Sequence, residues 1–263
     1  MTPPVLLDVG DDGIARLRLN RPDAANGMSV PLLKALHEAV LECAGDPNVR
    51  VVVLTGEGKN FCAGGDVKDF ASKGERLPDY LREATAYLQM AALALIRLEV
   101  PVVALVQGFA AGGGGLGLVC AADIVIAAES SKFMSAATRV GMAPDAGTSV
   151  TLSRIVGFRR AMELVLTDKV LSAGEAAELG LVTRVVADDA LHEEGEALAA
   201  KLAAGATKAL GETKRLMWTG LASSVEACLP DEARTVSELS GTEDAREGLA
   251  AVIERRAPEF KGR

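Results

Sequence analysis

The chain has few of the side chains that most often carry out catalysis. Only 3% of its 263 residues are aromatic, and it holds two histidines and four cysteines. The cysteines form no CxxC pair, which argues against a disulfide framework and against a zinc cluster. His37 and His192 lie among polar neighbours in helical patterns, so we expect both at the surface. With no GxSxG motif either, we expect chemistry that uses no metal, no cofactor and no histidine.

Basic residues are outnumbered by acidic ones, 28 to 36, and no segment is expected to be directed to a membrane. The net charge is −8, which argues against nucleic acid or an anionic membrane as a partner. The first residues have neither the basic region nor the apolar run of a signal peptide. The uncharged run 100–122 is long enough to span a bilayer, but Pro101, Gln107 and several glycines divide it into a β-rich half and a helical half. We expect a buried strand–loop–helix there, no membrane contact and a cytoplasmic protein.

Apolar runs that alternate with helical patterns predict an α/β fold. Unbroken apolar segments at 50–55, 102–106 and 124–127 are typical of buried strands, and 14–19 alternates like a half-buried one. Helical patterns cover 30–43 and 80–98. Such alternation indicates a parallel sheet with crossover helices. From residue 188 the pattern is helical only, and we expect helices over residues 188–203, 205–219, 223–239 and 242–257.

Glycine is abundant, with 27 residues, and two glycine-rich segments follow predicted strands. They span residues 60–67 and 108–117, at the strand ends where α/β sheets bind ligands. Glycines there let backbone N–H groups approach a ligand closely. The groups could form an oxyanion hole, which needs fixed donors and no charged side chain. A second interpretation is a dinucleotide fingerprint, Gly112-x-Gly114-x-x-Gly117 with Glu129 as a ribose ligand; a third is close packing of a helix on the sheet.

Several motifs in fixed order resemble the crotonase superfamily, the enoyl-CoA hydratases and isomerases. They are FCAGGDV at 61–67, GFAAGGGGLGLVCAADIVIA at 108–127 and VGMAPDAGTS at 140–149, and the resemblance extends over about residues 5–260. It implies a crotonase-like ββα spiral core over residues 1–200 that binds acyl-CoA. Residues 201–263 would then be a helical oligomerisation region, which builds a homo-trimer or a dimer of trimers. The substrate would be an acyl-CoA thioester, so that coenzyme A enters as part of the substrate.

The resemblance also implies the residues of the site. Gly65 is the first oxyanion donor. The second is Gly113 when the glycine run is aligned from Gly108 and Gly114 when it is aligned from Asp123, because the chain has one residue more than the family between those two positions; we favour Gly114. Substrate contacts are expected from Ala24, Ala25, Ala63, Gly65, Asp66, Val67, Lys68, Gly113, Gly114, Gly117 and Ala137. Of these, Asp66 is expected chiefly to orient its loop.

The side chains near the hole favour isomerisation over hydration. Hydratases of the family carry two carboxylates at the positions of Gly117 and Ala137, and both are absent here. Asp145 lies where some isomerases of the family hold their acid/base, and one carboxylate can move a proton between two carbons; its other expected role is to cap the following helix. The dehalogenase branch needs a histidine where this chain has Gln89. A hydratase that uses other acids, another thioester-enolate reaction and a non-catalytic acyl-CoA-binding protein remain as alternatives.

Overall fold

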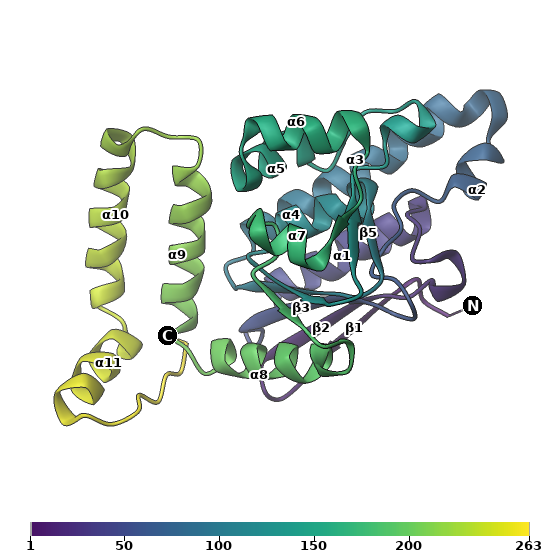
Figure 1. Ribbon diagram of the computed structural model, residues 1–263. Coiled ribbons are helices and arrows are strands. Elements are labelled where there is room, and N and C mark those ends of the chain that lie inside the picture. Colours follow the sequence, from purple (N-terminus) through teal and green to yellow (C-terminus); the bar gives the residue numbers. More distant parts are fainter. Residues whose placement is uncertain (1, 263) are drawn as a thin grey trace.

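A six-stranded sheet forms the centre of the protein, which a computed structural model describes for residues 2–262 (Figure 1). Its strand order is β1-β2-β3-β4-β6-β9, and only the β1–β2 pair is antiparallel. A smaller sheet has the order β5-β7-β8. The strands are β1 (Val5–Val9), β2 (Ile14–Leu19), β3 (Val51–Gly56), β4 (Val102–Val106), β5 (Phe109–Ala111), β6 (Ile124–Ala128), β7 (Lys132–Met134), β8 (Leu171–Ser172) and β9 (Arg184–Val186).

Helices surround the two sheets. They are α1 (Val30–Gly45), α2 (Val67–Ala71), α3 (Leu77–Arg97), α4 (Leu118–Ala121), α5 (Thr148–Val156), α6 (Phe158–Thr167), α7 (Ala173–Glu178), α8 (Leu191–Ala203), α9 (Thr207–Gly220), α10 (Val225–Ser240) and α11 (Glu243–Glu254). Short helical segments are η1 (Pro22–Ala24), η2 (Gly74–Arg76), η3 (Gly113–Gly117), η4 (Thr138–Val140) and η5 (Asp188–Ala190). The four long strands and the helices expected from periodicity are confirmed within a few residues, as is the helical region after residue 188.

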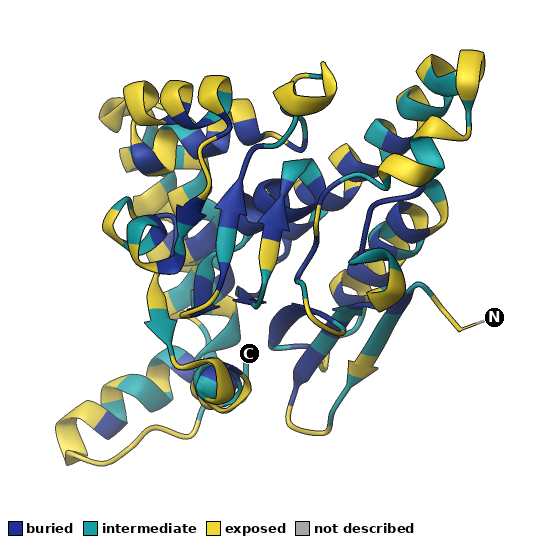
Figure 2. Ribbon diagram, turned by 45° about the vertical axis from the view of Figure 1, so that its right-hand side comes forward, coloured by how far each residue is buried: buried dark blue, intermediate teal, exposed yellow. Residues whose placement is uncertain are grey.

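The unbroken apolar strands are buried because helices cover both faces of the large sheet. Alternate residues of a strand point to opposite faces, and β3 follows this rule: Val52 and Leu54 join one apolar cluster with α1 and α3, while Val51 and Val53 join another with α8. The buried residues accordingly gather on the central strands, and the outer helix surfaces are exposed (Figure 2).

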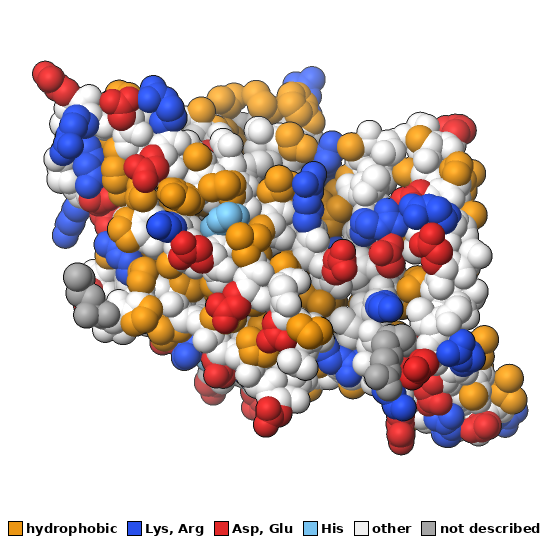
Figure 3. Space-filling model, turned by 180° about the vertical axis from the view of Figure 1, so that it is seen from behind, with side chains coloured by type: hydrophobic (Ala, Val, Ile, Leu, Met, Phe, Trp, Pro, Cys, Tyr) orange, Lys and Arg blue, Asp and Glu red, His pale blue; other side chains and the backbone are white. Residues whose placement is uncertain are grey.

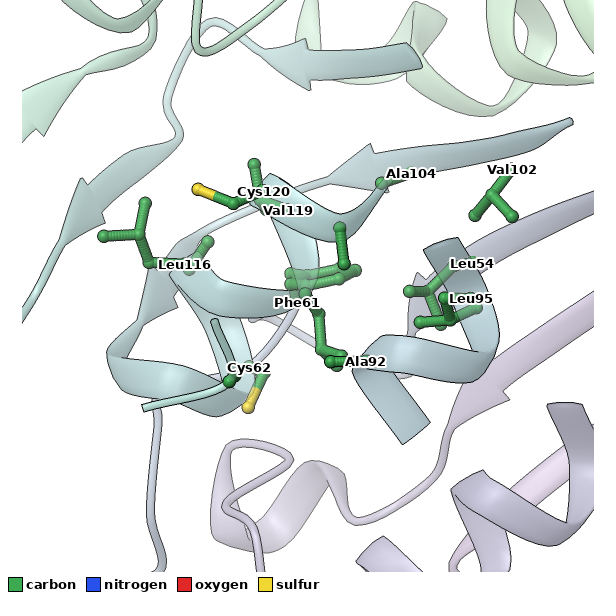
Figure 4. Close-up of a cluster of buried hydrophobic side chains, with 14 of the residues drawn as sticks. Leu54, Phe61, Cys62, Ala92, Leu95, Val102, Ala104, Leu116, Val119 and Cys120 are labelled. Atoms are coloured by element: carbon green, nitrogen blue, oxygen red, sulfur yellow. The ribbon is translucent and has the colours of Figure 1, made fainter. Parts of the chain in front are cut away.

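The larger cluster is centred on a phenylalanine next to the first glycine-rich segment. Phe61 is fully buried, and it lies between α3 and the η3–α4 turn together with Leu116 and Ala92 (Figure 4). This cluster fixes the glycine-rich segments against the core, since Cys62, the residue after Phe61, pairs with Ala110 of β5 in a parallel bridge.

The small sheet could not be predicted from periodicity. Its strands have two or three residues each, too few for an alternating pattern. The chain leaves β4 and enters β5 through Gly108, whose φ is +58°, and a Cβ there would lie 2.7 Å from Asn60 Oδ1 and closer still to the Lys59 carbonyl. Only glycine fits this turn.

The helices α9 to α11 stand apart from the sheets (Figure 1). Buried Lys214 of α9 joins them to the core: its Nζ pairs with Asp123 at 2.8 Å and donates to the carbonyls of Leu95 and Val100. Trp218 Nε1 donates to the same Asp123 carboxylate at 2.9 Å. The boundary expected after residue 200 falls in the last turn of α8.

Charged side chains of both signs are interspersed on the face turned away in Figure 1 (Figure 3). Within residues 2–262, no helix is both long enough and apolar enough to cross a membrane.

Candidate active site

The two segments expected to contact coenzyme A lie side by side. The turn that contains Ala24 and Ala25 is hydrogen-bonded along its length to the loop 63–66: Ala63 N donates to Ala25 O at 3.0 Å, Met28 N to Gly64 O at 2.8 Å and Asp66 N to Met28 O at 3.0 Å. Backbone atoms thus form a continuous wall from segments separated by about 40 residues of sequence. Lys68 and Val67 are exposed in the first turn of α2, beyond this wall.

Two polar side chains that the sequence did not single out hold this wall in place. Asn26 is fully buried and its Nδ2 donates to the carbonyls of Glu57, Asn60 and Phe61. Arg21 donates to Gly27 O at 2.6 Å and pairs with Asp66 at 2.8 Å. An asparagine and an arginine in or beside an expected turn were the only available signal, because the carbonyl partners of Asn26 and the carboxylate partner of Arg21 lie 30 residues or more along the chain.

Asp66 is bonded both to its own loop and to the neighbouring turn. One carboxylate oxygen accepts from Asp69 N at 3.0 Å and so caps the start of α2, while the other pairs with Arg21. Both oxygens are therefore used to fix the loop. The neighbouring amides of Gly64 and Asp66 are hydrogen-bonded, whereas the amide of Gly65 has no acceptor among residues 2–262.

The second glycine run begins beside Gly65. A Cβ on Gly112 would lie 3.3 Å from Gly64 Cα and 3.9 Å from Gly65 N, so the two runs meet at their backbones. Gly113–Gly117 then form a π-helix, η3, which continues as α4. A π-helix has i→i+5 hydrogen bonds and accommodates one residue more than an α-helical turn. A helix of this kind can accommodate the additional residue expected between Gly108 and Asp123.

Gly113 and Gly114 have different surroundings. Gly113 is partly exposed, and a Cβ there would lie 2.6 Å from Asp145 Cγ and 3.1 Å from Leu88 Cδ2. Gly114 is buried, and a Cβ there would lie 2.9 Å from Met28 Cε and 3.1 Å from Cys62 Sγ. Gly113 thus adjoins the Asp145 carboxylate, and Gly114 faces the core.

Asp145 is held next to the glycine helix by a tight turn. Ala146 and Gly147 both have positive φ, +53° and +77°. Burial raises the pKa of the Asp145 carboxyl above its usual range. The capping role considered for this side chain is wrong, because α5 has Gly147 as its N-cap with no side-chain cap bond, and Thr148 N donates to the backbone carbonyl of Asp145.

The positions where hydratases of the family carry carboxylates are close to this site and bear none. Gly117 is buried, and a Cβ on it would lie 2.6 Å from the Cβ of Ala146, next to Asp145. Ala137 is the N-cap of η4 in the loop that leads to Asp145, and its carbonyl accepts from Met142 N at 3.0 Å. Within residues 2–262, no group of three or more His, Cys, Asp and Glu side chains is arranged to hold a metal ion.

The family described as Enoyl-CoA hydratase/isomerase has a model that matches residues 10–263 of this chain. The chain belongs to the enoyl-CoA hydratase/isomerase family. The dinucleotide interpretation of Gly112, Gly114 and Gly117 does not fit this fold, in which β5 separates the large sheet from the glycine helix.

Several members of the enoyl-CoA hydratase/isomerase family resemble the chain over nearly their whole length. A Rhodobacter capsulatus protein named "Probable enoyl-CoA hydratase" is 40% identical over 96% of each chain. The 1,2-epoxyphenylacetyl-CoA isomerase of Escherichia coli is 34% identical, over 96% of this chain and 97% of its own. The crystal structure of an enoyl-CoA hydratase from Bacillus anthracis has a TM-score of 0.93 at 34% identity, covering 99% and 100% of the two chains. These similarities show that the crotonase fold and the enoyl-CoA hydratase/isomerase family inferred from the motifs are correct.

Proposed function

We propose that the protein is an enoyl-CoA isomerase in which Asp145 moves a proton along the acyl chain. The observation that carries the proposal is a single partly buried carboxylate beside the glycine helix, with Gly117 and Ala137 in place of the paired carboxylates of hydratases. Burial raises the pKa of Asp145 toward the range in which a carboxyl both accepts and returns a proton.

The backbone amides of Gly65 and Gly113 are the proposed oxyanion donors. Gly65 N is unpartnered, the two glycine runs meet beside it, and Gly113 is the partly exposed residue that adjoins Asp145. Gly114, favoured by alignment from Asp123, packs on Met28 and Cys62 instead, which supports Gly113. A donor of this kind contributes roughly 3–4 kcal/mol of transition-state stabilisation.

The reaction needs one group that takes and returns a proton. The Asp145 carboxylate removes a proton from C2 of a 3-enoyl thioester. The electron pair of the broken C–H bond then delocalises over the double bond and onto the thioester oxygen, where the two amides stabilise the negative charge. Asp145 returns the proton to C4, the double bond forms between C2 and C3, and the carboxylate is restored. Atoms and charge balance without a co-reactant.

The proposed coenzyme A contacts lie on the hydrogen-bonded wall and on α2. They are Ala24, Ala25, Ala63, Asp66, Val67 and Lys68, through their backbones and, for Lys68, through the ammonium group. The chemistry of a thioester substrate requires no further cofactor.

A second copy of the chain is the proposed partner of two exposed apolar surfaces, as expected for a homo-trimer or a dimer of trimers. One surface covers α5 and α6, and the other covers the detached helices α9 to α11 (Figure 1). Their exposed large apolar side chains are Val150, Ile155, Phe158, Met162, Leu166, Met217, Leu221, Val225, Leu229, Val236, Leu249, Val252 and Ile253. Patches of this kind mark interaction surfaces.

The decisive experiment follows the conversion of a 3-enoyl-CoA to its conjugated 2-enoyl-CoA by ultraviolet absorbance. We expect conversion by the purified protein and a loss of about 100-fold to 10,000-fold in Asp145→Asn, the usual contribution of a general base. Crotonyl-CoA serves as the hydration substrate, and water addition at a rate above isomerisation would reject the proposal.

A ring-derived acyl-CoA is the second candidate substrate class. It is favoured by the similarity to the Escherichia coli 1,2-epoxyphenylacetyl-CoA isomerase. Turnover of 1,2-epoxyphenylacetyl-CoA, with kcat/KM above that for straight-chain 3-enoyl-CoA esters, would select this class. Tight acyl-CoA binding without turnover of any of these esters would instead indicate a binding protein.

A further inference from the structure

A ring pair adjoins the proposed oxyanion site in a protein with few rings. Among the residues described, Phe70 and Tyr80 form the one close ring–ring contact, edge to face with centroids 6.1 Å apart. Phe70 belongs to α2, which starts at the cap Asp66 next to Gly65, and Tyr80 belongs to the first turn of α3. The chain between them passes through a turn and η2, and the Asp66–Arg21 pair ties its start to the wall of the site.

The ring of Phe70 occupies the space of a side chain at Gly65. A Cβ on Gly65 would lie 2.7 Å from Phe70 Cζ and closer still to its Cε2. The ring is thus in van der Waals contact with the backbone unit whose amide is the first proposed donor. Any larger residue at position 65 would push the ring away.

A polar network holds Tyr80, and through it the ring of Phe70. The Tyr80 hydroxyl accepts from Val30 N at 3.0 Å and donates to Asp69. Lys73 Nζ pairs with Asp69 at 2.7 Å and lies 4.3 Å from the centre of the Tyr80 ring. Burial, with the neighbouring Asp69, raises the pKa of Tyr80 to about 12, so the hydroxyl keeps its proton and the bond persists across the physiological range.

We propose that Phe70, held in place by Tyr80, shields the oxyanion site from water, so that the enolate receives its proton from Asp145 and not from solvent. The inference rests on the proposed function. It assigns Phe70 as a specificity-determining residue that separates isomerisation from exchange with water, and Tyr80 as its positioning residue.

Exclusion of water has two effects on this chemistry. Hydrogen bonds from fixed amides to a developing negative charge are stronger in a water-excluded site than in water. A carboxylic acid that water cannot reach also keeps the proton it has taken, and side reactions of the intermediate with water are suppressed. The apolar ring against Gly65 offers no hydrogen bond that would compete for the oxyanion.

The test measures deuterium in the product of isomerisation run in D2O. Wild type is expected to transfer the substrate's own proton and to give a product low in deuterium. Phe70→Ala should raise the ratio of solvent exchange to transfer about tenfold or more, and Phe70→Leu, which keeps an apolar cover, should raise it less. Tyr80→Phe loses hydrogen bonds and keeps the ring, so a rise of about two- to tenfold is expected.

Tyr87→Phe is the matched control, because Tyr87 lies on the same helix outside this network, and it should leave the ratio unchanged. A ratio that stays at the wild-type value in Phe70→Ala while the melting temperature falls would assign the ring a purely structural role and overturn the proposal. A wild-type product already equilibrated with solvent would overturn it as well.

A spectroscopic measurement decides the inference independently of turnover. Cinnamoyl-CoA bound in a water-excluded oxyanion site should show a red-shifted absorbance, which Phe70→Ala should move back toward that of the free ester while Tyr87→Phe does not. An equal red shift in wild type and Phe70→Ala would reject the shielding role. Absence of isomerised product together with a Phe70-dependent red shift would reject isomerisation and retain the shield.

Discussion

Gly113→Ala tests the geometry of the site with the smallest possible change. Its Cβ would lie 2.6 Å from Asp145 Cγ and closer still to Oδ1, whereas ordinary contacts begin at 3.4 Å. Oδ1 of the carboxylate must therefore retreat by more than 1 Å, and a displacement of about 1 Å at a reacting group already costs about 100-fold in rate. The amide of residue 113 is kept, so binding of the thioester should be little affected. We expect kcat to fall about 100-fold while KM changes by less than about threefold.

A double-mutant cycle with Asp145→Ala separates displacement of the carboxylate from a general loss of folded structure. Once the carboxylate is gone, the added methyl group has room, so Gly113→Ala should cost little further activity in that background. The assay is the absorbance change of 3-enoyl-CoA isomerisation, with circular dichroism as a check on folding. A Gly113→Ala enzyme that keeps its wild-type kcat, or an undiminished further loss in the Asp145→Ala background, would refute the proposed contact.

Three further perturbations follow from the same contacts. Because burial raises the pKa of Asp145 in the folded protein, its ionisation opposes folding above the ordinary aspartate pKa of about 4; Asp145→Asn should raise Tm at pH 7 and lose this advantage below pH ~4, and an equal Tm difference at both pH values would contradict the assignment. Arg21→Met removes the bonds to Gly27 and Asp66 and should raise KM for the acyl-CoA more than it lowers kcat, whereas an unchanged KM would argue that the wall does not bind coenzyme A. Lys214→Met removes the buried cation that pairs with the partly buried Asp123 and should cost about 3 kcal/mol in urea unfolding; a loss below about 1 kcal/mol would refute this expectation.

Local sequence patterns were sufficient to predict the strands and helices whose burial is regular. β3 and β4 are buried on both faces and read as unbroken apolar runs, and the periodicity of α1 and α3 reflects one face on the same core. The short strands β5 and β7 pair across 20 residues or more of chain and carry no period of their own. The connection from α2 to α3 was also hard to predict from periodicity. α2 has five residues and starts at the cap Asp66, and the contact between Tyr80 and Asp69 joins the two helices.

The sequence by itself determined the family of the protein and the residues available for its site. Glycines after two buried strands indicated exposed amides, and the ordered motifs indicated the family. The absence of carboxylates at 117 and 137 is the basis of the isomerase proposal. Only the tertiary structure decided that Gly113–Gly117 form a π-helix, that Gly113 adjoins Asp145 while Gly114 packs on Met28, and that the ring of Phe70 lies against Gly65. These outcomes depend on ångström-scale contacts between segments far apart in the chain, and such contacts arise only when the core closes around them.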